Sequence, residues 1–263
     1  MNGIICNESN LQIYDCYFAK NESRNGGAIY NQYRAYIVGS AIEHNNSQHG
    51  GGIYNTGSLT LSGVKIAYNI CSGRGGGIYN IGSCDIDVCT LQGNISMEYG
   101  AGIYTEKEIH IRNTRFLDNN PTTIDGPADA IHNWWGDNNG PESDSVTETL
   151  KYDPWLVADF NITQVGNEDL IVKLEITSDS KGNSLSINHL SHFPKKESFA
   201  LVHSDKAYVM DETPGFNGES VTRVNTRGHE EISIICKLDN QVFHEVIRRE
   251  DLDINPDWPV LKY

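Results

Sequence analysis

The sequence has no long apolar segment and few basic residues. No run approaches the ~20 consecutive apolar residues that a membrane-spanning helix requires. No signal peptide is visible either, because residues 1–3 lead directly into Ile4-Ile5-Cys6-Asn7. Only 20 lysines and arginines stand against 35 aspartates and glutamates, which gives a formal net charge of −15. This balance argues against nucleic-acid phosphates or an anionic membrane surface as the main partner.

Motifs for nucleotide or metal chemistry are also missing. Triple glycines occur, but they precede strand-like segments, whereas a phosphate-binding loop precedes a helix. His189 and His192 have no cysteine or carboxylate at ligand spacing, which argues against zinc. The oxygen-rich segment 137–140, followed by Glu142 and Asp144, lacks the spacing of a calcium loop and is more typical of a turn. We therefore expect no metal and no cofactor.

What the sequence does contain is a repeat of 24 or 25 residues. A motif of the type Gly-Gly-Gly-Ile-Tyr-Asn recurs four times, with steps of 24, 25 and 25 residues between its isoleucines. These isoleucines are Ile29, Ile53, Ile78 and Ile103, between weaker copies at Ile5 and Ile131. A period of this length is typical of a solenoid, in which each repeat buries its apolar face only against its neighbours.

Each repeat contains three short segments in which apolar and polar residues alternate, as in half-buried strands. In the third repeat these segments are residues 52–55, 59–61 and 64–66, separated by turn residues. When the repeats are overlaid, two apolar columns and one asparagine column emerge. Their members are Ile13, Ile37, Leu61, Ile86 and Ile111; Phe18, Ile42, Ile66, Leu91 and Phe116; and Asn21, Asn45, Asn69, Asn94 and Asn119.

The asparagines and glycines suit the turns of such a solenoid. A repeated asparagine can link its amide to the repeats above and below, and it tolerates left-handed backbone geometry. The glycines permit positive φ and a close approach of the backbone before the first strand. The pattern predicts an all-β fold with a parallel β-helix of about six coils.

Two features of the sequence resemble known surface proteins. Gly75-Gly76-Gly77-Ile78-Tyr79-Asn80, the strand Leu59-Thr60-Leu61 and a closing asparagine look like the repeat of polymorphic outer membrane proteins. With Asn133-Trp134-Trp135-Gly136-Asp137-Asn138-Asn139-Gly140-Pro141 the chain resembles the adhesin-like surface proteins of methanogenic archaea. The resemblance implies a right-handed parallel β-helix of the pectin lyase fold, an immunoglobulin-like domain and an extracellular or cell-surface location.

Four segments are expected along the chain. Residues 1–140 form the β-helix, closed by Trp134 and Trp135, and residues 141–154 form a polar linker. Residues 155–250 form an Ig-like β-sandwich, and residues 251–263 form a polar tail. The sandwich prediction rests on strand-length runs at Leu156–Ile162, Leu170–Ile176, Phe199–Val202, Ser220–Val224, Ile232–Leu238 and Val242–Ile247.

Two further expectations concern the ends of the helix. Because the first residues already lie inside a coil, we expect the chain to be a fragment of a longer surface protein or a truncated gene product. At the other end, Trp134 and Trp135 are expected to cover the core of the last coil, and an aromatic platform for a sugar ring is the alternative.

The six cysteines are expected to be free thiols. Cys84 and Cys89 overlay inward apolar columns, and Cys16 occupies the second of these columns in the first coil. Cysteine at such positions replaces a small apolar residue in a stacked core. Buried thiols are therefore favoured over disulfides.

A column of tyrosines is the leading candidate for binding. Tyr30, Tyr54, Tyr79 and Tyr104 alternate with inward isoleucines and should form an outward aromatic stripe. Such a stripe can stack on sugars or anchor a partner chain. It can equally stabilise the outer face of the solenoid by stacking alone.

Carboxylates on one strand are the candidate for catalysis. Asp85 and Asp87 point the same way and overlay His110 and Arg112 in the next coil. An acid, a base and an arginine in this arrangement would suit a polysaccharide lyase or glycoside hydrolase. Paired opposite charges on a solvated face are the simpler interpretation.

The sequence favours a non-enzymatic, adhesin-like protein that presents a rigid solenoid to a polysaccharide or another cell-surface ligand. The first alternative is a β-helix polysaccharide lyase or glycoside hydrolase that uses Asp85, Asp87 and Arg112. The second is a passive stalk or wall protein. Ligand identity, anchoring and oligomeric state do not follow from the sequence.

Overall fold

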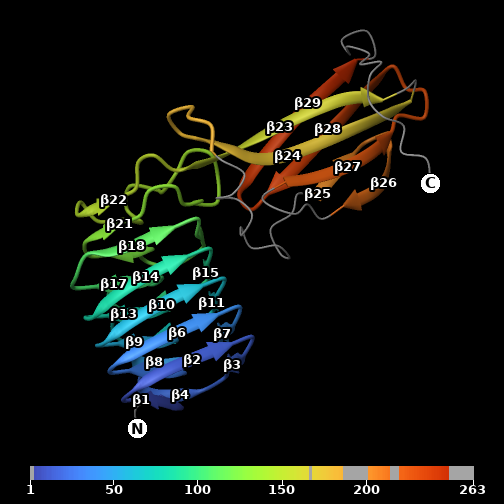
Figure 1. Ribbon diagram of the computed structural model, residues 1–263. Coiled ribbons are helices and arrows are strands. Elements are labelled where there is room, and N and C mark those ends of the chain that lie inside the picture. The colour runs from blue at the N-terminus through green and yellow to red at the C-terminus, as the bar shows by residue number, and fades with distance from the viewer. Residues whose placement is uncertain (1–2, 166–167, 186–200, 214–218, 249–263) are drawn as a thin grey trace.

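The computed structural model describes residues 3–165, 168–185, 201–213 and 219–248. Within this part of the chain every regular element is a strand. The first strands wind into a parallel β-solenoid of about six turns, and small antiparallel sheets follow it (Figure 1). The all-β prediction with its parallel helix is confirmed.

Four parallel sheets run along the solenoid, with one strand from each turn. Sheet I contains β1 (Ile5–Asn7), β5 (Ile29–Asn31), β9 (Ile53–Asn55), β13 (Ile78–Asn80), β17 (Ile103–Thr105) and β20 (Ile124–Asp125). Sheet II contains β2 (Asn10–Tyr14), β6 (Arg34–Val38), β10 (Ser58–Ser62), β14 (Ser83–Asp87), β18 (Ile109–Arg112), β21 (Ala128–Asp129) and β22 (Leu150–Lys151). Sheet III contains β3 (Tyr17–Ala19), β7 (Ala41–Glu43), β11 (Lys65–Ala67), β15 (Thr90–Gln92) and β19 (Arg115–Leu117). Sheet IV contains β4 (Glu22–Asn25), β8 (Asn46–His49), β12 (Ile70–Cys71) and β16 (Ile95–Ser96).

The strands of sheets I, II and III correspond to the three segments expected in each repeat. Sheet IV was not expected, because its strands are only two to four residues long. Two residues are too few to show an alternation of apolar and polar side chains. Strands β4 and β8 lie directly before the glycine that begins the next turn, and three residues separate β12 and β16 from it.

The apolar columns meet in the register that the repeat predicts. Leu61 pairs with Ile37 on one side and Ile86 on the other, and all three are buried. Ile66 stands in the same way beside Ile42 in sheet III. Burial of one such side chain contributes about 1.5–3 kcal/mol. The core therefore grows by the same increment with each added turn.

Two ladders of buried asparagines support the turns, one through Asn45, Asn69 and Asn94 and one, in sheet I, through Asn31, Asn55 and Asn80. In the ladder expected from the sequence, Asn45 Nδ2 donates to Asn69 Oδ1 at 2.9 Å, and Asn69 Nδ2 donates to Asn94 Oδ1 at 3.1 Å. The expected left-handed geometry, however, lies one residue earlier, at His44 (φ 56°) and Tyr68 (φ 55°). The asparagine itself stays outside the left-handed region, because its amide must point inward to reach the next turn.

The glycine that opens each repeat adopts the positive φ that the sequence predicts. Gly50 and Gly75 have φ of 64° and 73°. A Cβ atom at Gly50 would lie 2.3 Å from the carbonyl oxygen of Ile53, closer than any real contact. Glycine is required there both for its backbone geometry and for space.

Residues 141–154, which we expected to form a linker, contribute a strand to the solenoid. Leu150 and Lys151 of β22 pair in parallel with Ala128 and Asp129 of β21. Leu150 is buried in the solenoid core. Val146 and Tyr152 of the same segment also pack against this core, so the segment belongs to the solenoid and extends sheet II by one strand.

The two adjacent tryptophans enter different cores. Trp135 stacks on Phe116 in the solenoid core, with ring centroids 4.6 Å apart, as expected for a residue that seals the last coil. Trp134 belongs instead to the core of the antiparallel sheets, so its assignment to the solenoid end was wrong. Successive side chains of an extended backbone point to opposite sides, which explains the difference. Both rings are buried, which excludes an exposed sugar platform.

The antiparallel part consists of two sheets around one core. Apolar residues of both sheets, such as Val172 and Ile234, share this core. One sheet has the order β23 (Leu156–Val165), β24 (Asp169–Asp179), β27 (Glu219–Asn225) and β26 (Tyr208–Thr213). The other has the order β25 (Leu201–Ser204), β28 (Glu231–Leu238) and β29 (Gln241–Arg248).

Strand β26 was not expected, because the register shifts between Val209 and Asp211 and breaks the alternation on which strand prediction depends. Several expected features lie outside the described residues: the histidines at 189 and 192, the start of the run at Phe199 and the polar tail 251–263.

All six cysteines are free. Cys84 and Cys89 are buried in the solenoid core, as predicted. Burial raises the pKa of the Cys89 thiol to about 12. Cys16 is exposed, so the prediction that it is buried in the core was wrong. The Cys16 thiol donates to the carbonyl oxygen of Tyr14 at 3.1 Å.

Candidate functional site

The predicted tyrosine stripe forms a continuous stack on the outer face of sheet I. Tyr30, Tyr54, Tyr79 and Tyr104 occupy one register position of neighbouring strands. Their ring centroids are 5.2, 4.6 and 5.0 Å apart, with interplanar angles of 27°, 10° and 26°. All four side chains are half-buried. The spacing of the rings follows from the spacing of parallel strands.

This stacking determines which parts of the rings a ligand could reach. The faces of Tyr54 and Tyr79 are covered by their neighbours in the stack. A sugar ring could not stack on those faces unless the tyrosines separated. The stripe therefore offers ring edges and a row of hydroxyl groups, and much of its aromatic surface serves the solenoid itself.

Charged residues flank the end of the stripe that Tyr79 and Tyr104 form. Tyr79 Oη donates to Glu106 Oε1 at 3.4 Å. Burial raises the pKa of Tyr79 to about 12, and Tyr54 and Glu106 act in the same direction. Arg74 donates from Nη1 to Tyr104 Oη at 3.0 Å, and its Cζ lies 5.0 Å from the centre of that ring. These contacts hold the hydroxyl groups in place.

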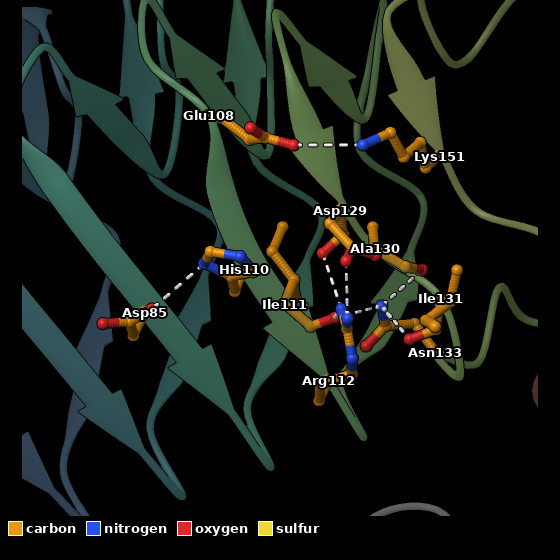
Figure 2. A network of polar contacts seen from close by, with 10 residues as sticks. All are labelled: Asp85, Glu108, His110, Ile111, Arg112, Asp129, Ala130, Ile131, Asn133 and Lys151. Atoms are coloured by element: carbon orange, nitrogen blue, oxygen red, sulfur yellow. Dashed lines mark hydrogen bonds and ion pairs between the residues drawn. The ribbon is translucent and has the colours of Figure 1, made fainter.

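Sheet II carries the candidate carboxylates on its outer face. Asp85 pairs in register with His110, as the overlay predicts, and Asp85 Oδ1 lies 3.5 Å from His110 Nδ1 (Figure 2). The side chains are 67% and 61% exposed, respectively. An ion pair this accessible to water contributes little to stability.

Arg112 does not join Asp87, although the two residues are paired in register. Its guanidinium instead donates to Asp129, from Nη2 to Oδ2 at 2.7 Å and from Nη1 to the carbonyl oxygen at 2.7 Å (Figure 2). Asp87 accepts a hydrogen bond from Asn113 Nδ2 at 2.9 Å. All three residues of the catalytic alternative therefore border one hollow, but Arg112 binds Asp129 and neither of the two predicted aspartates.

Asp129 was missed in the sequence because the repeat changes length after the fifth motif. It pairs in register with His110, although only 19 residues separate them. Burial acts to raise the pKa of Asp129, but the hydrogen bond and the charge of Arg112 outweigh this effect, so the pKa is lowered. Asp129 is thus held as a carboxylate by Arg112.

A hollow of about 460 Å³ opens on the same face of sheet II. Tyr36 borders it on one side, and His110 and Arg112 border it on the other. Between them lie Thr60 and Ser62, whose small side chains leave space above the sheet. The hollow therefore follows from small residues in the middle of a row of larger ones.

The polar segment 137–140 is a connection between the two parts of the protein. Asn138 Nδ2 donates to the carbonyl oxygen of Ala158 at 2.9 Å, and its backbone N–H donates to Gln241 Oε1 at 3.0 Å. Asp137 Oδ1 accepts from the backbone N–H of Asn139 at 2.7 Å, as in a turn. Among the residues that the structure describes, no group of three histidines, cysteines or carboxylates is placed to hold a metal ion.

Comparison with known families identifies the repeat. Residues 15–32 match the Chlamydia polymorphic membrane protein (Chlamydia_PMP) repeat, a family that belongs to membrane or surface proteins. No curated protein and no solved structure matches the chain. Over the described ranges, no helix has the length and apolar character needed to cross a membrane. The chain thus carries a repeat of the Chlamydia polymorphic membrane protein type, wound into a parallel β-solenoid.

Proposed function

We propose that this protein is a non-enzymatic, adhesin-like protein of the cell surface. Its solenoid would present a rigid face to carbohydrate or another surface ligand. The observation that carries this proposal is the pair of ordered outer faces, the tyrosine stripe of sheet I and the hollow of sheet II. Buried asparagine ladders fix the spacing of both faces, so little conformational freedom would be lost on binding. The repeat family supports a surface location.

The arrangement of charges favours binding over turnover. A lyase that acts on uronate chains must neutralise the sugar carboxylate, and Arg112 is already bound to Asp129. A glycosidase needs a general acid in an environment of low polarity, whereas the Asp85 side chain is 67% exposed. These contacts support the non-enzymatic interpretation over a polysaccharide lyase or glycoside hydrolase.

The antiparallel sheets would act as a spacer or a second contact module. Two sheets around a common core are the arrangement expected of an Ig-like domain. Buried polar contacts join this part to the last turns of the solenoid, which suits a module that holds the solenoid at a fixed angle. A passive stalk with no specific ligand would use the same junction.

Affinity electrophoresis through gels that contain different polysaccharides tests the proposal. Retardation of the native protein in at least one gel, without clearing of that gel on staining, is the expected result. Clearing around the band would show turnover and contradict the non-enzymatic assignment. Equal mobility in all gels, together with no binding to whole cells, would favour the passive stalk. Protein unfolded before loading controls for nonspecific retardation.

A further inference from the structure

We infer that the hollow of sheet II is a binding site for an uncharged polysaccharide, a chain of neutral hexoses. The inference rests on the proposed function, because it names the face and the sugar class that the solenoid would use. Three features of the hollow carry it: its shape, an accessible aromatic ring and the sign of its charge.

The shape of the hollow suits a short stretch of a polymer. Its volume of about 460 Å³ lies within the range of small-molecule sites. Apart from Asn113, the residues around it come from β6, β10, β14 and β18, four neighbouring strands of sheet II. At about 4.8 Å between strands, four strands extend roughly 14 Å along the solenoid axis. This length accommodates more than one sugar ring.

Tyr36 supplies the aromatic surface that the tyrosine stripe cannot. It is 38% exposed and borders the hollow. Its register neighbour on that side is Thr60, which is too small to cover the ring. Its contact with Tyr14, on the other side, is edge-to-face, with centroids 6.2 Å apart. A hexose can therefore pack its apolar face of C–H groups against Tyr36.

The polar groups opposite Tyr36 match sugar hydroxyls. Asp85 and Asp87 are exposed and border the hollow. An ionised carboxylate accepts about four hydrogen bonds, so each retains acceptor capacity beyond its contact with His110 or Asn113. Neighbouring hydroxyls of one sugar can donate to a single carboxylate, and these hydrogen bonds to a charged group are comparatively strong.

The charge of the hollow selects against acidic sugars. Asp85 and Asp87 carry negative charge, while the charge of Arg112 is balanced by Asp129. The chain as a whole has a formal net charge of −15. Uronates, sulfated glycans and other polyanions would be repelled from this face. A neutral hexose chain meets no such penalty.

The test compares two tyrosine variants on a panel of polysaccharides. Tyr36→Ala removes the proposed platform, and Tyr33→Ala is the matched control, because Tyr33 is 57% exposed and does not border the hollow. Thr60→Trp fills the hollow instead of truncating it. The probes are a neutral glucan, a neutral mannan, polygalacturonate and chitosan, with affinities from gel retardation and calorimetry. Thermal unfolding confirms that each variant is folded.

The expected result is binding of a neutral probe that weakens about tenfold or more in Tyr36→Ala and Thr60→Trp but not in Tyr33→Ala. Unchanged affinity in both hollow variants would overturn the site and leave the proposed function standing. Preference for polygalacturonate or for chitosan over the neutral probes would overturn the assigned sugar class. Failure of the unmodified protein to bind any probe would overturn this inference together with the carbohydrate part of the proposed function.

Discussion

Arg115 and Asp239 lie 124 residues apart in the sequence and form a buried ion pair between the solenoid and the antiparallel sheets. Arg115 Nε donates to Asp239 Oδ2 at 2.8 Å, and the Nη2 atom contacts Oδ1. The indole N–H of Trp134 donates to the same Oδ2 atom at 2.7 Å. The side chains of Arg115 and Asp239 are only 4% and 5% exposed. A pair buried this deeply constrains how the two parts can be oriented, because separating them would leave charges without partners.

The first prediction concerns this ion pair. Asp239→Asn keeps the size of the side chain and suits the positive φ of 54° at this turn, but it removes the charge. We expect a loss of about 3–5 kcal/mol in unfolding free energy, since Arg115 would remain buried without a counter-ion. Urea unfolding followed by circular dichroism measures the loss.

The matched control for Asp239→Asn is Glu231→Gln. Glu231 pairs with Arg248 at 3.0 Å, but both side chains are more than half exposed. Its removal should cost less than about 1 kcal/mol. Equal effects of the two substitutions would contradict the view that the buried pair fixes the junction.

The second prediction concerns the two tryptophans. Trp134→Ala and Trp135→Ala should each cost about 3–5 kcal/mol, because both remove a large buried ring. The two substitutions should destabilise different parts of the protein. Hydrogen exchange should accelerate in β23 and β28 for Trp134→Ala, and in β18 to β22 for Trp135→Ala. Acceleration confined to the solenoid in both variants would mean that Trp134 does not pack in the second core.

The third prediction concerns the asparagine ladder of sheet I. Asn55 Nδ2 donates to Asn80 Oδ1 at 2.6 Å, and Asn55 Oδ1 accepts from Asn31 Nδ2 at 2.7 Å. Asn55→Ala would leave buried polar atoms without partners, at about 1–3 kcal/mol for each. Asn55→Thr should cost less, because Thr105 occupies the equivalent position in the fifth turn and accepts from Asn80. Thermal unfolding ranks the variants.

Asn46→Ala serves as the control for the ladder. Asn46 lies in β8 with its side chain exposed, so its loss should stay within about 0.5 kcal/mol. If Asn55→Ala were as mild as Asn46→Ala, the ladder would not contribute to the stability of the turns.

The difference between the regular turns and the last turns of the solenoid shows how much of the structure could be predicted from the sequence. Within regular turns, each residue has a neighbour 24 or 25 positions away, so the columns of Leu61 and Asn69 follow from spacing alone. After the fifth turn the spacing changes, and Asp129 reaches His110 in a register that the period does not show. The rotamer of Arg112 decides whether its guanidinium contacts Asp87 or Asp129, and sequence spacing does not determine that rotamer. The hollow of sheet II also escaped prediction, because it results from small side chains between larger ones.

The fourth prediction concerns the thiols. Ellman's reagent reacts with thiolates that it can reach, and only Cys6 and Cys16 are exposed. Two thiols should therefore react in the native protein and six after denaturation. Burial raises the pKa values of Cys71 and Cys236 to about 12, which slows their reaction further. A third fast-reacting thiol under native conditions would contradict the packing of the core.

The last prediction concerns stability at alkaline pH. Burial, Tyr54 and Glu106 raise the pKa of Tyr79 from 10.0 to about 12, so the folded state favours the neutral phenol. This contribution to stability is fully present below pH 10, the pKa of tyrosine in the unfolded chain, and is lost as the pH rises through about 12.

Tyr79→Phe keeps the stacked ring and removes the ionisable hydroxyl, so the decline in stability between pH 10 and 12 should become shallower. Tyr14→Phe, whose ring is 51% exposed and lies outside the stripe, is the matched control. Unfolding midpoints in urea at pH 9, 10, 11 and 12, with tyrosinate absorbance recorded in parallel, decide the question. Identical profiles for the two variants would show that the stripe does not shield Tyr79 from ionisation.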